Sequence, residues 1–387
     1  MSGTKKDLTF FEATAIVTGY GVGAGVLAVP YLASRSGVVP FLLILVVGYG
    51  ISLLLHLMIV EMMMRDDETT QLVELLGKYL FVGKIGKVFL WLFFILITLA
   101  FIGTLTIYIV GSGEILYELF ELPMWVGELI IYVLAAGVVL FGLKAVGISE
   151  KFAIIAIALV VLALSVLSLR LPEFSLDVAS RGGVKEAMAL FGVMMFSFWS
   201  FFSVPQAVEG LQWNKRLAPW AVICGIGITL VFILTITLMA IAVSSEVTRI
   251  VITGWGEAIG DWAEIFGSLF ILLAMLTSFW SVSLALAVVL AERLNWNDRL
   301  SWVVATVPSL VVALIGFTDF LGFLQITGGI IAILAAILMV PAYLSVKKKG
   351  RNKNPEWTMG VFGGWIFLAL VIIGYVMTAV ANVIAIE

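Results

Sequence analysis

Apolar residues run through this chain in long stretches that are separated by short polar or charged segments. A membrane-spanning helix needs about 20 mostly apolar residues in a row, and eleven stretches of about that length are present. The predicted spans are residues 9–34, 38–63, 86–115, 122–142, 149–169, 186–208, 217–243, 263–291, 300–317, 321–345 and 360–384. We therefore expect an all-α integral membrane protein with eleven transmembrane helices.

The first predicted span contains four glycines at alternate positions. Residues 19 to 25 are Gly-Tyr-Gly-Val-Gly-Ala-Gly. Glycine costs about 1 kcal/mol relative to alanine inside a helix, so this run weakens the helix considerably. Non-helical backbone at mid-depth in a bilayer survives only where protein or a water-filled cavity surrounds it. The run therefore predicts a broken helix whose freed N–H and C=O groups can coordinate a solute.

Composition leaves almost no material for a soluble module. Of the 387 residues, 62% are hydrophobic and 12% are charged, which is far from the average of soluble domains. The single cysteine and the single histidine cannot assemble a disulfide framework or a Cys/His metal site. No Ser/His/Asp arrangement suggests nucleophilic chemistry. We therefore expect a protein that is not an enzyme, that has no cofactor and that binds no nucleic acid.

Lysine and arginine residues are distributed unequally between the two sides that the eleven spans define. With the N-terminus inside, 17 of the 22 fall on the inner side. Cytoplasmic loops of membrane proteins carry the excess of lysine and arginine. The pattern therefore predicts a cytoplasmic N-terminus and, after eleven spans, a C-terminus on the outside of the plasma (inner) membrane.

The order of long and short segments recurs at an offset of about 177 residues. Each copy has a broken span, a second span, an amphipathic connection (64–85 and 244–262), a long third span and two more spans. Five is an odd number, so the second copy starts from the opposite side of the membrane. We expect a first repeat over 1–170, an inverted second repeat over 171–346 and an additional helix within 347–387.

The counterpart of the glycine run in the second copy is also interrupted. Residues 196–205 of the sixth span read Phe-Ser-Phe-Trp-Ser-Phe-Phe-Ser-Val-Pro. Ser203 followed by Pro205 is typical of a helix start, so one half-helix should end near Ser197 to Ser200 and the next should begin near Ser203. Interrupted spans at corresponding positions of two inverted halves are the best sequence pointer to the binding site of a secondary transporter.

Two segments resemble a known group of transporters. Gly23-Ala-Gly-Val-Leu-Ala-Val-Pro30 resembles the first-span signature of the amino acid/auxin permease branch of the amino acid–polyamine–organocation superfamily. That branch includes aromatic amino acid permeases and sodium-coupled neutral amino acid transporters. Glu209 followed by Asn214-Lys215-Arg216 is similar to the Glu…Asn-Pro-Lys-Arg element after the sixth span, although here Leu217 comes next and the usual proline is absent. The resemblance implies the leucine-transporter (LeuT) fold, a 5+5 inverted repeat with broken helices 1 and 6.

An amino acid zwitterion must exchange its hydration for fixed dipoles in such a site. A half-helix that begins near Ala24 offers N–H groups and a positive dipole end to a carboxylate. By the resemblance, the ammonium group would lie against carbonyls near Gly21 and near residues 197–198. No charged side chain occupies either break, which favours a neutral amino acid, apolar or aromatic. The expected substrate-binding residues are Gly21, Gly23, Ala24, Gly25, Ser197, Phe198, Trp199, Phe201 and Phe202, with the aromatic side chains lining the pocket, gating it or packing elsewhere.

The eighth span contains a segment that bears on the coupling ion. Residues 274–278, Ala-Met-Leu-Thr-Ser, resemble the element that supplies the second sodium site in sodium-coupled members of this fold. The resemblance implies a sodium site made of the carbonyls of Gly19, Val22 and Ala274 and the hydroxyls of Thr277 and Ser278. The alternative is that these hydroxyls only bond the carbonyl four residues earlier, as Ser and Thr often do in membrane helices.

A proton is the alternative coupling ion. Proton-coupled relatives can place a lysine from the fifth span where this sodium would lie, but here no charged residue occurs between Lys151 and Arg170. Another carrier would be needed, and an ionisable residue within a span is a functional candidate by default. The candidates are Glu12, Glu61, Glu209 and Asp319. Glu12 lies roughly 10 Å before the glycine run at 1.5 Å per residue, so it is also a candidate for a cytoplasmic gate.

Together these patterns predict a secondary active transporter that imports a neutral amino acid by sodium symport across the lipid bilayer, with alternating access. A proton symporter or exchanger of the same fold is one alternative. Another is a nutrient receptor, which would bind an amino acid but show no counterflow. An ion channel is disfavoured because no ring of repeated filter segments is present.

Overall fold

A computed structural model describes residues 7–68, 70–172, 174–175, 182–243, 255, 259–316 and 320–386 of the chain. These residues form helices joined by short loops, with no strand among them. The first half contains α1 (Phe10–Gly21), α2 (Ala24–Ser36), α3 (Val38–Asp66), α4 (Leu72–Tyr79), α5 (Gly83–Phe120), α6 (Met124–Val139) and α7 (Leu143–Ser168). The second half contains α8 (Val184–Ser197), α9 (Val204–Gly210), η1 (Gln212–Leu217), α10 (Ala218–Val243), α12 (Asp261–Leu294), α13 (Asp298–Leu314), α14 (Phe320–Lys349), η2 (Gly360–Gly363) and α15 (Trp365–Ile386). The prediction of an all-α protein is confirmed.

The longer helices have the length and composition of membrane spans. Among the described residues, seven helices are long and apolar enough to cross a bilayer, and the bent pair of α1 and α2 makes eight. The helices α6 and α13 are shorter, with 16 and 17 residues. A helix or a broken pair occupies each of the eleven predicted ranges. The number that crosses the bilayer stays a prediction.

The division into two inverted repeats also stays a prediction. Its first amphipathic connection, 64–85, contains the short helix α4. Most of the corresponding connection, 244–262, lies outside the described residues. The predicted ends of the two repeats, at residues 170 and 346, therefore stay predictions.

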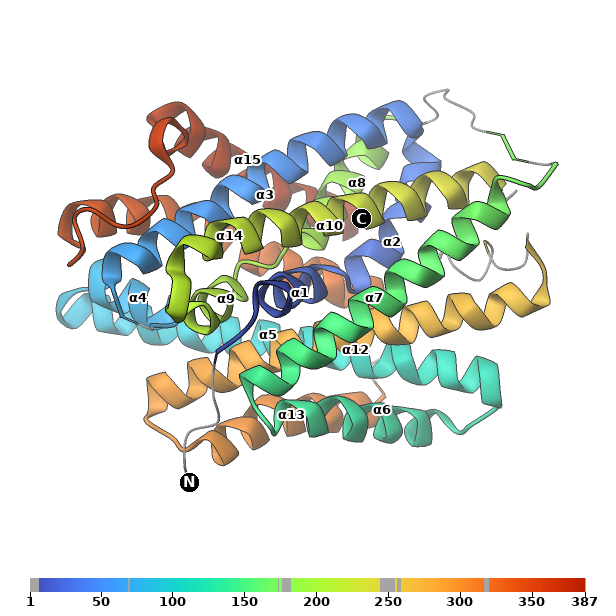
Figure 1. Ribbon diagram of the computed structural model, residues 1–387, viewed down its shortest axis with the longest axis horizontal. Coiled ribbons are helices and arrows are strands. Elements are labelled where there is room, and N and C mark those ends of the chain that lie inside the picture. Colours follow the sequence, from blue (N-terminus) through green and yellow to red (C-terminus); the bar gives the residue numbers. More distant parts are fainter. Residues whose placement is uncertain are drawn as a thin grey trace.

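The first broken helix changes direction at the glycine run, where α1 and α2 meet at an angle of 51°. Val22 ends α1 by donating its N–H to the carbonyl of Thr18 at 2.8 Å. The next N–H, that of Gly23, bonds the carbonyl of Gly21 at 2.9 Å. In an unbroken helix it would bond the carbonyl of Gly19, which therefore loses its intrahelical donor. Figure 1 shows α1 in the middle of the bundle, where it packs against α7, α10 and α12.

The second broken helix has the ends that the sequence predicts. One half, α8, ends at Ser197, and the other, α9, follows Ser203. Turns fill the gap: Ser203 donates both its N–H and its hydroxyl to the carbonyl of Ser200, at 2.9 and 2.6 Å. Pro205 lies in the first turn of α9, where its missing N–H costs no helical hydrogen bond. Because α8 packs against α2, the two breaks lie close together.

Ion pairs gather at one end of the bundle, which we call the basic end. Some pairs lie within one segment and others join different helices, and their lysines and arginines are ones that the charge count assigns to the same side. In the described residues they join Glu12 to Lys144, Glu61 to Arg65, Asp66 and Glu68 to Lys78, Asp67 to Lys215, Glu74 to Arg293 and Glu68 to Arg351. The structure therefore places these side chains together, and the cytoplasmic position of this end stays a prediction.

Candidate functional site

The two breaks touch each other through glycines. A Cβ on Gly25 would come within 2.9 Å of the Cα of Ser197 and 3.0 Å of its backbone nitrogen. A Cβ on Gly21 would lie 2.8 Å from the hydroxyl of Ser200 and 3.1 Å from the carbonyl of Ser197. At Gly25 the backbone of Ser197 is too close for a side chain, and at Gly21 a side chain would have little room, so the contact depends most on glycine at position 25. Backbone groups of both broken helices thus face the same small space.

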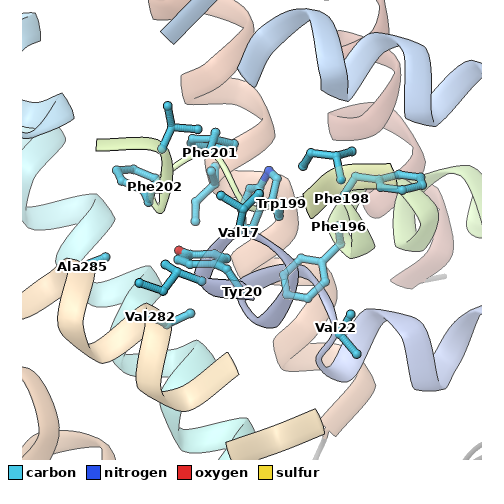
Figure 2. Packing of buried hydrophobic residues seen from close by; sticks show 14 of the residues in the cluster. Val17, Tyr20, Val22, Phe196, Phe198, Trp199, Phe201, Phe202, Val282 and Ala285 are labelled. Atoms are coloured by element: carbon cyan, nitrogen blue, oxygen red, sulfur yellow. The ribbon is translucent and has the colours of Figure 1, made fainter. Parts of the chain in front are cut away.

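A narrow cavity lies where the breaks meet. Its volume is about 10 Å³, which is room for about one water molecule. Figure 2 shows the rings of Tyr20, Phe196 and Trp199 around the break in α1. The lining residues are Tyr20, Gly21, Gly23, Gly25, Phe101, Thr104, Tyr108, Phe196, Trp199 and Ile331. The lining is aromatic, with hydroxyl groups and without a charged side chain, and it must move apart before an amino acid fits.

The residues predicted for the substrate site divide between this cavity and its surroundings. Gly21, Gly23, Gly25 and Trp199 line it, and Ala24 begins the half-helix α2 beside it. Ser197, in the second break, lies against Gly21 and Gly25, two of the glycines that line the cavity. The remaining three aromatic residues are not among the lining residues: Phe198, Phe201 and Phe202 lie against Tyr49, His56 and Phe101, respectively.

Several lining side chains are not among the predicted residues. Phe101, Thr104 and Tyr108 lie on one face of α5, which is apolar almost throughout, so the sequence does not show which face points inward. A usable signal is the spacing of Thr104 and Tyr108, because two polar groups one turn apart in a membrane helix face the protein interior. Tyr20 could have been found from its place inside the glycine run.

The residues predicted for the sodium site lie at the junction of α1 and α12. Ser278 donates its hydroxyl to the carbonyl of Gly19 at 2.8 Å, which joins the two helices. Thr277 donates to the carbonyl of Ala274 at 2.9 Å within α12. Val22 is the residue that ends α1. The structure therefore brings Gly19 and Ser278 together and leaves Thr277 bonded within its own helix.

A buried carboxylate lies beside this junction. Glu150 of α7 is fully buried, and its Oε1 accepts a hydrogen bond from Ser281 of α12 at 2.6 Å. A Cβ on Gly19 would overlap the Glu150 carboxylate. The predicted fifth span begins at residue 149, whereas α7 begins at Leu143. Glu150 is therefore two turns inside the helix, and the sequence-based search for a charge from the fifth span missed it.

The four carboxylates predicted as proton carriers have other surroundings. Glu12 accepts from Lys144 at 2.6 Å, and Glu61 accepts from Arg65 at 2.8 Å. Glu209 belongs to the last turn of α9. None of these three lines the cavity. The fourth candidate, Asp319, lies outside the described residues.

Leu8 closes the bundle at its basic end. Its side chain is buried and lies against Gly147 and Gly210, where added Cβ atoms would meet it. Its N–H donates to the carbonyl of Gly210 at 2.8 Å, and its carbonyl accepts from Trp213 Nε1 at 2.9 Å. The chain just before α1 is thus held between α7 and the end of α9. In this conformation the residues before α1 fill the space between α7 and α9 at the basic end.

Replacing Lys144 with alanine is expected to loosen this closure. Glu12 is buried and would lose its ammonium partner. An unpaired buried carboxylate is costly, so the conformation in which water reaches Glu12 becomes more favourable. In a Cys224→Ala background, a cysteine at the buried position Gln206 should react several times faster with a water-soluble maleimide. Lys151→Ala is the matched control, because Lys151 lies over the ring of Phe152 on the same helix. Equal rates in the two variants would contradict a gating role for Glu12.

Two interrupted helices that meet at the centre of a helical membrane bundle define the class of secondary transporters with the LeuT fold. The model of the tryptophan/tyrosine permease family matches residues 6–382, so the chain belongs to that family. It is therefore a multi-pass membrane permease and not an enzyme, as the sequence predicts. Over 395 aligned residues it is 26% identical to tyrosine-specific transport system 1 of Haemophilus influenzae, and the match covers 95% of each protein.

Solved structures show the same fold at low sequence identity. The crystal structure of MhsT in complex with L-phenylalanine has a TM-score of 0.71 and 17% identity, covering 99% of this chain and all of that one. Mhp1, a nucleobase-cation-symport-1 family transporter, has a TM-score of 0.67 and 15% identity, with 99% and 92% covered. A manganese transporter of Eremococcus coleocola has a TM-score of 0.66 and 15% identity, with 97% and 86% covered. These likenesses confirm the predicted fold class.

Proposed function

We propose that this protein imports an aromatic amino acid across the plasma membrane by symport with sodium. The observation that carries the proposal is the cavity where the two breaks meet, which has backbone dipoles on one wall and aromatic rings on the others. The family match and the similarity to a tyrosine-specific transport system support this choice of substrate. A placement in the amino acid/auxin permease branch belongs to the same proposal.

The substrate would bind with its charged groups at the breaks and its ring among the aromatic side chains. The first turn of α2 offers N–H groups without intrahelical partners and a positive dipole end, which suit the carboxylate. A Cβ on Gly21 would lie 3.1 Å from the carbonyl of Ser197, so the two breaks are close together, and the ammonium group would donate to the carbonyls of Gly21 and Ser197. The aromatic ring of the substrate would then take the place that the side chain of Trp199 or Phe196 occupies in the present cavity. Stacking against the remaining rings would stabilise the bound substrate.

The sodium ion would bind at the junction of α1 and α12. The break leaves the carbonyl of Gly19 without its helical donor, and Ser278 supplies a hydroxyl oxygen beside it. Oxygen atoms are the ligands that hard cations prefer. Because Gly19 and Gly23 flank the same broken turn, an ion at Gly19 would hold the turn in the shape that the substrate needs.

Counterflow in proteoliposomes tests the proposal. Vesicles loaded with tyrosine are expected to take up labelled tyrosine, tryptophan or phenylalanine, and to exclude labelled lysine and glutamate because no charged side chain lines the cavity. Concentrative uptake should need an inward sodium gradient. Thr277→Ala and Ser278→Ala should each reduce that sodium dependence without abolishing tyrosine counterflow.

Two outcomes would contradict this function in different ways. Uptake driven by a proton gradient alone, unchanged in Thr277→Ala and Ser278→Ala, would contradict sodium coupling and leave aromatic amino acid transport in place. Binding of tyrosine without any counterflow would favour a receptor of the same fold. A matched control is Thr98→Ala, a substitution of a hydroxyl on α5 that does not line the cavity.

A further inference from the structure

With Glu150 ionised, the oxygen acceptors around it outnumber the hydrogens that the neighbouring serine hydroxyls supply. The acceptors are both carboxylate oxygens of Glu150 and the carbonyls of Gly19 and Ile16. Ser278 donates its single hydroxyl hydrogen to Gly19. Ser281 has one hydrogen for two acceptors, Glu150 Oε1 at 2.6 Å and the carbonyl of Ile16 at 3.3 Å. The second carboxylate oxygen of Glu150 has no hydrogen-bond partner among the described residues.

These oxygens form two adjacent layers. Ile16 and Gly19 are three residues apart on α1, and Ser278 and Ser281 are three residues apart on α12, so each pair lies on one face of its helix. Glu150 of α7 closes the third side, with its carboxylate directly against Gly19. The residues involved are fully buried or nearly so. The contacts therefore bring carboxylate, hydroxyl and carbonyl oxygens of three helices next to one another.

An ionised carboxylate at this place is expensive without a cation beside it. No ion pair of the described residues includes Glu150. The neighbouring Lys151 lies over the ring of Phe152, with its Nζ 4.9 Å from the ring centroid. A bound cation would supply the missing positive charge and would also occupy the free oxygen lone pairs.

We propose that Glu150 is the charged ligand of the coupling-cation site, and that Ser281 and the carbonyl of Ile16 complete the site begun by Gly19 and Ser278. This proposal rests on the proposed function and deepens its ion site. One carboxylate balances one positive charge, so the set suits a monovalent cation such as sodium. Divalent sites usually add further carboxylates, and the described residues contain no cluster of three His, Cys, Asp or Glu side chains.

The site also explains why residue 19 is glycine. Any side chain there would overlap the Glu150 carboxylate. The carboxylate joins α7 to α1 at the level of the break, and Ser281 joins it to α12. A cation held by all three helices would therefore bind only while α1 is packed against both α7 and α12.

Thermal unfolding of the purified full-length protein tests the site without an amino acid. Sodium that binds only the folded protein raises its stability as the concentration rises. Sodium chloride replaces potassium chloride stepwise, so that the ionic strength stays constant. The Tm of the wild type is expected to rise with sodium concentration and to saturate. The half-saturating sodium concentration of Glu150→Gln should be about tenfold higher than that of the wild type, or more. Ser281→Ala should shift it in the same direction, and Glu150→Asp should lie between wild type and Glu150→Gln.

Glu128→Gln is the matched control, because Glu128 is a buried carboxylate on α6 that packs against Gly113, away from α1. A half-saturating sodium concentration equal to wild type in Glu150→Gln would overturn the proposal, as would a wild type that sodium does not stabilise. If Glu150→Gln fails to fold, Glu150→Asp and Ser281→Ala decide the result. Labelled tyrosine binding, measured separately, distinguishes a failure of this ion site from a failure of the proposed substrate.

Discussion

Replacing Gly25 with alanine is expected to lower amino acid transport about a hundredfold or more, since displacing a binding site by about 1 Å can cost that much. A Cβ at this position would lie 2.9 Å from the Cα of Ser197. The obstacle is backbone, so it cannot rotate away, and the two breaks would have to separate. The first turn of α2 and the carbonyls of the second break would then no longer face one substrate. Initial rates of labelled tyrosine uptake in proteoliposomes measure the effect.

Gly50→Ala provides the matched control for this substitution. Gly50 lies within α3, and a Cβ there meets no atom within 4 Å. Alanine is favoured over glycine inside a helix by about 1 kcal/mol, so this variant should transport as the wild type does and unfold at a higher temperature. Normal transport by Gly25→Ala, with both proteins inserted at equal levels, would show that the contact between the breaks is not required.

Replacing Glu61 with leucine is expected to destabilise the protein by about 3 to 5 kcal/mol, the usual cost of removing one partner of a buried ion pair. The Glu61 carboxylate is buried and accepts from Arg65 Nε at 2.8 Å, from the hydroxyl of Tyr343 at 2.8 Å and from the N–H of Met359 at 2.9 Å. Leucine would leave all three donors without this acceptor. Reversible unfolding in detergent or bicelles measures the loss.

Glu68→Leu serves as the comparison, because Glu68 also forms ion pairs at the basic end, with Lys78 and Arg351, but is exposed. Exposed pairs contribute about 0 to 1 kcal/mol. A second comparison is the double variant Glu61→Leu with Arg65→Leu. It also removes the guanidinium that Glu61→Leu leaves unpaired, so it should be more stable than Glu61→Leu alone. Equal losses for Glu61→Leu and Glu68→Leu would contradict the special position of Glu61.

The sequence predicts the broken helices well because the chain marks them with residues that act locally. Alternating glycines weaken the helix at α1, and Ser203 with Pro205 marks the start of α9, so the ends follow without knowledge of tertiary contacts. The apolar stretches likewise locate the helices, since their length is set by the bilayer. These features are encoded within a few neighbouring residues.

What the sequence does not show is which groups face each other across helices. Glu150 was missed because a hydropathy pattern begins the fifth span at the first long apolar stretch, whereas the helix begins earlier, after Gly142 with its φ of +82°. That shift moves Glu150 from a surface position to the interior. The cavity residues of α5 were missed for a related reason. This helix is apolar on all sides, so its sequence does not indicate which face points toward the cavity.

The ion pairs of the basic end bear on the timing of the transport cycle. Each partly exposed pair is worth only about 0.2 to 1 kcal/mol, but separating the helices at this end would break together those pairs that join different helices. A difference of about 1.4 kcal/mol changes the ratio of two conformations tenfold. Raised ionic strength screens such pairs, so it should shorten the time that an empty carrier waits before opening at the basic end.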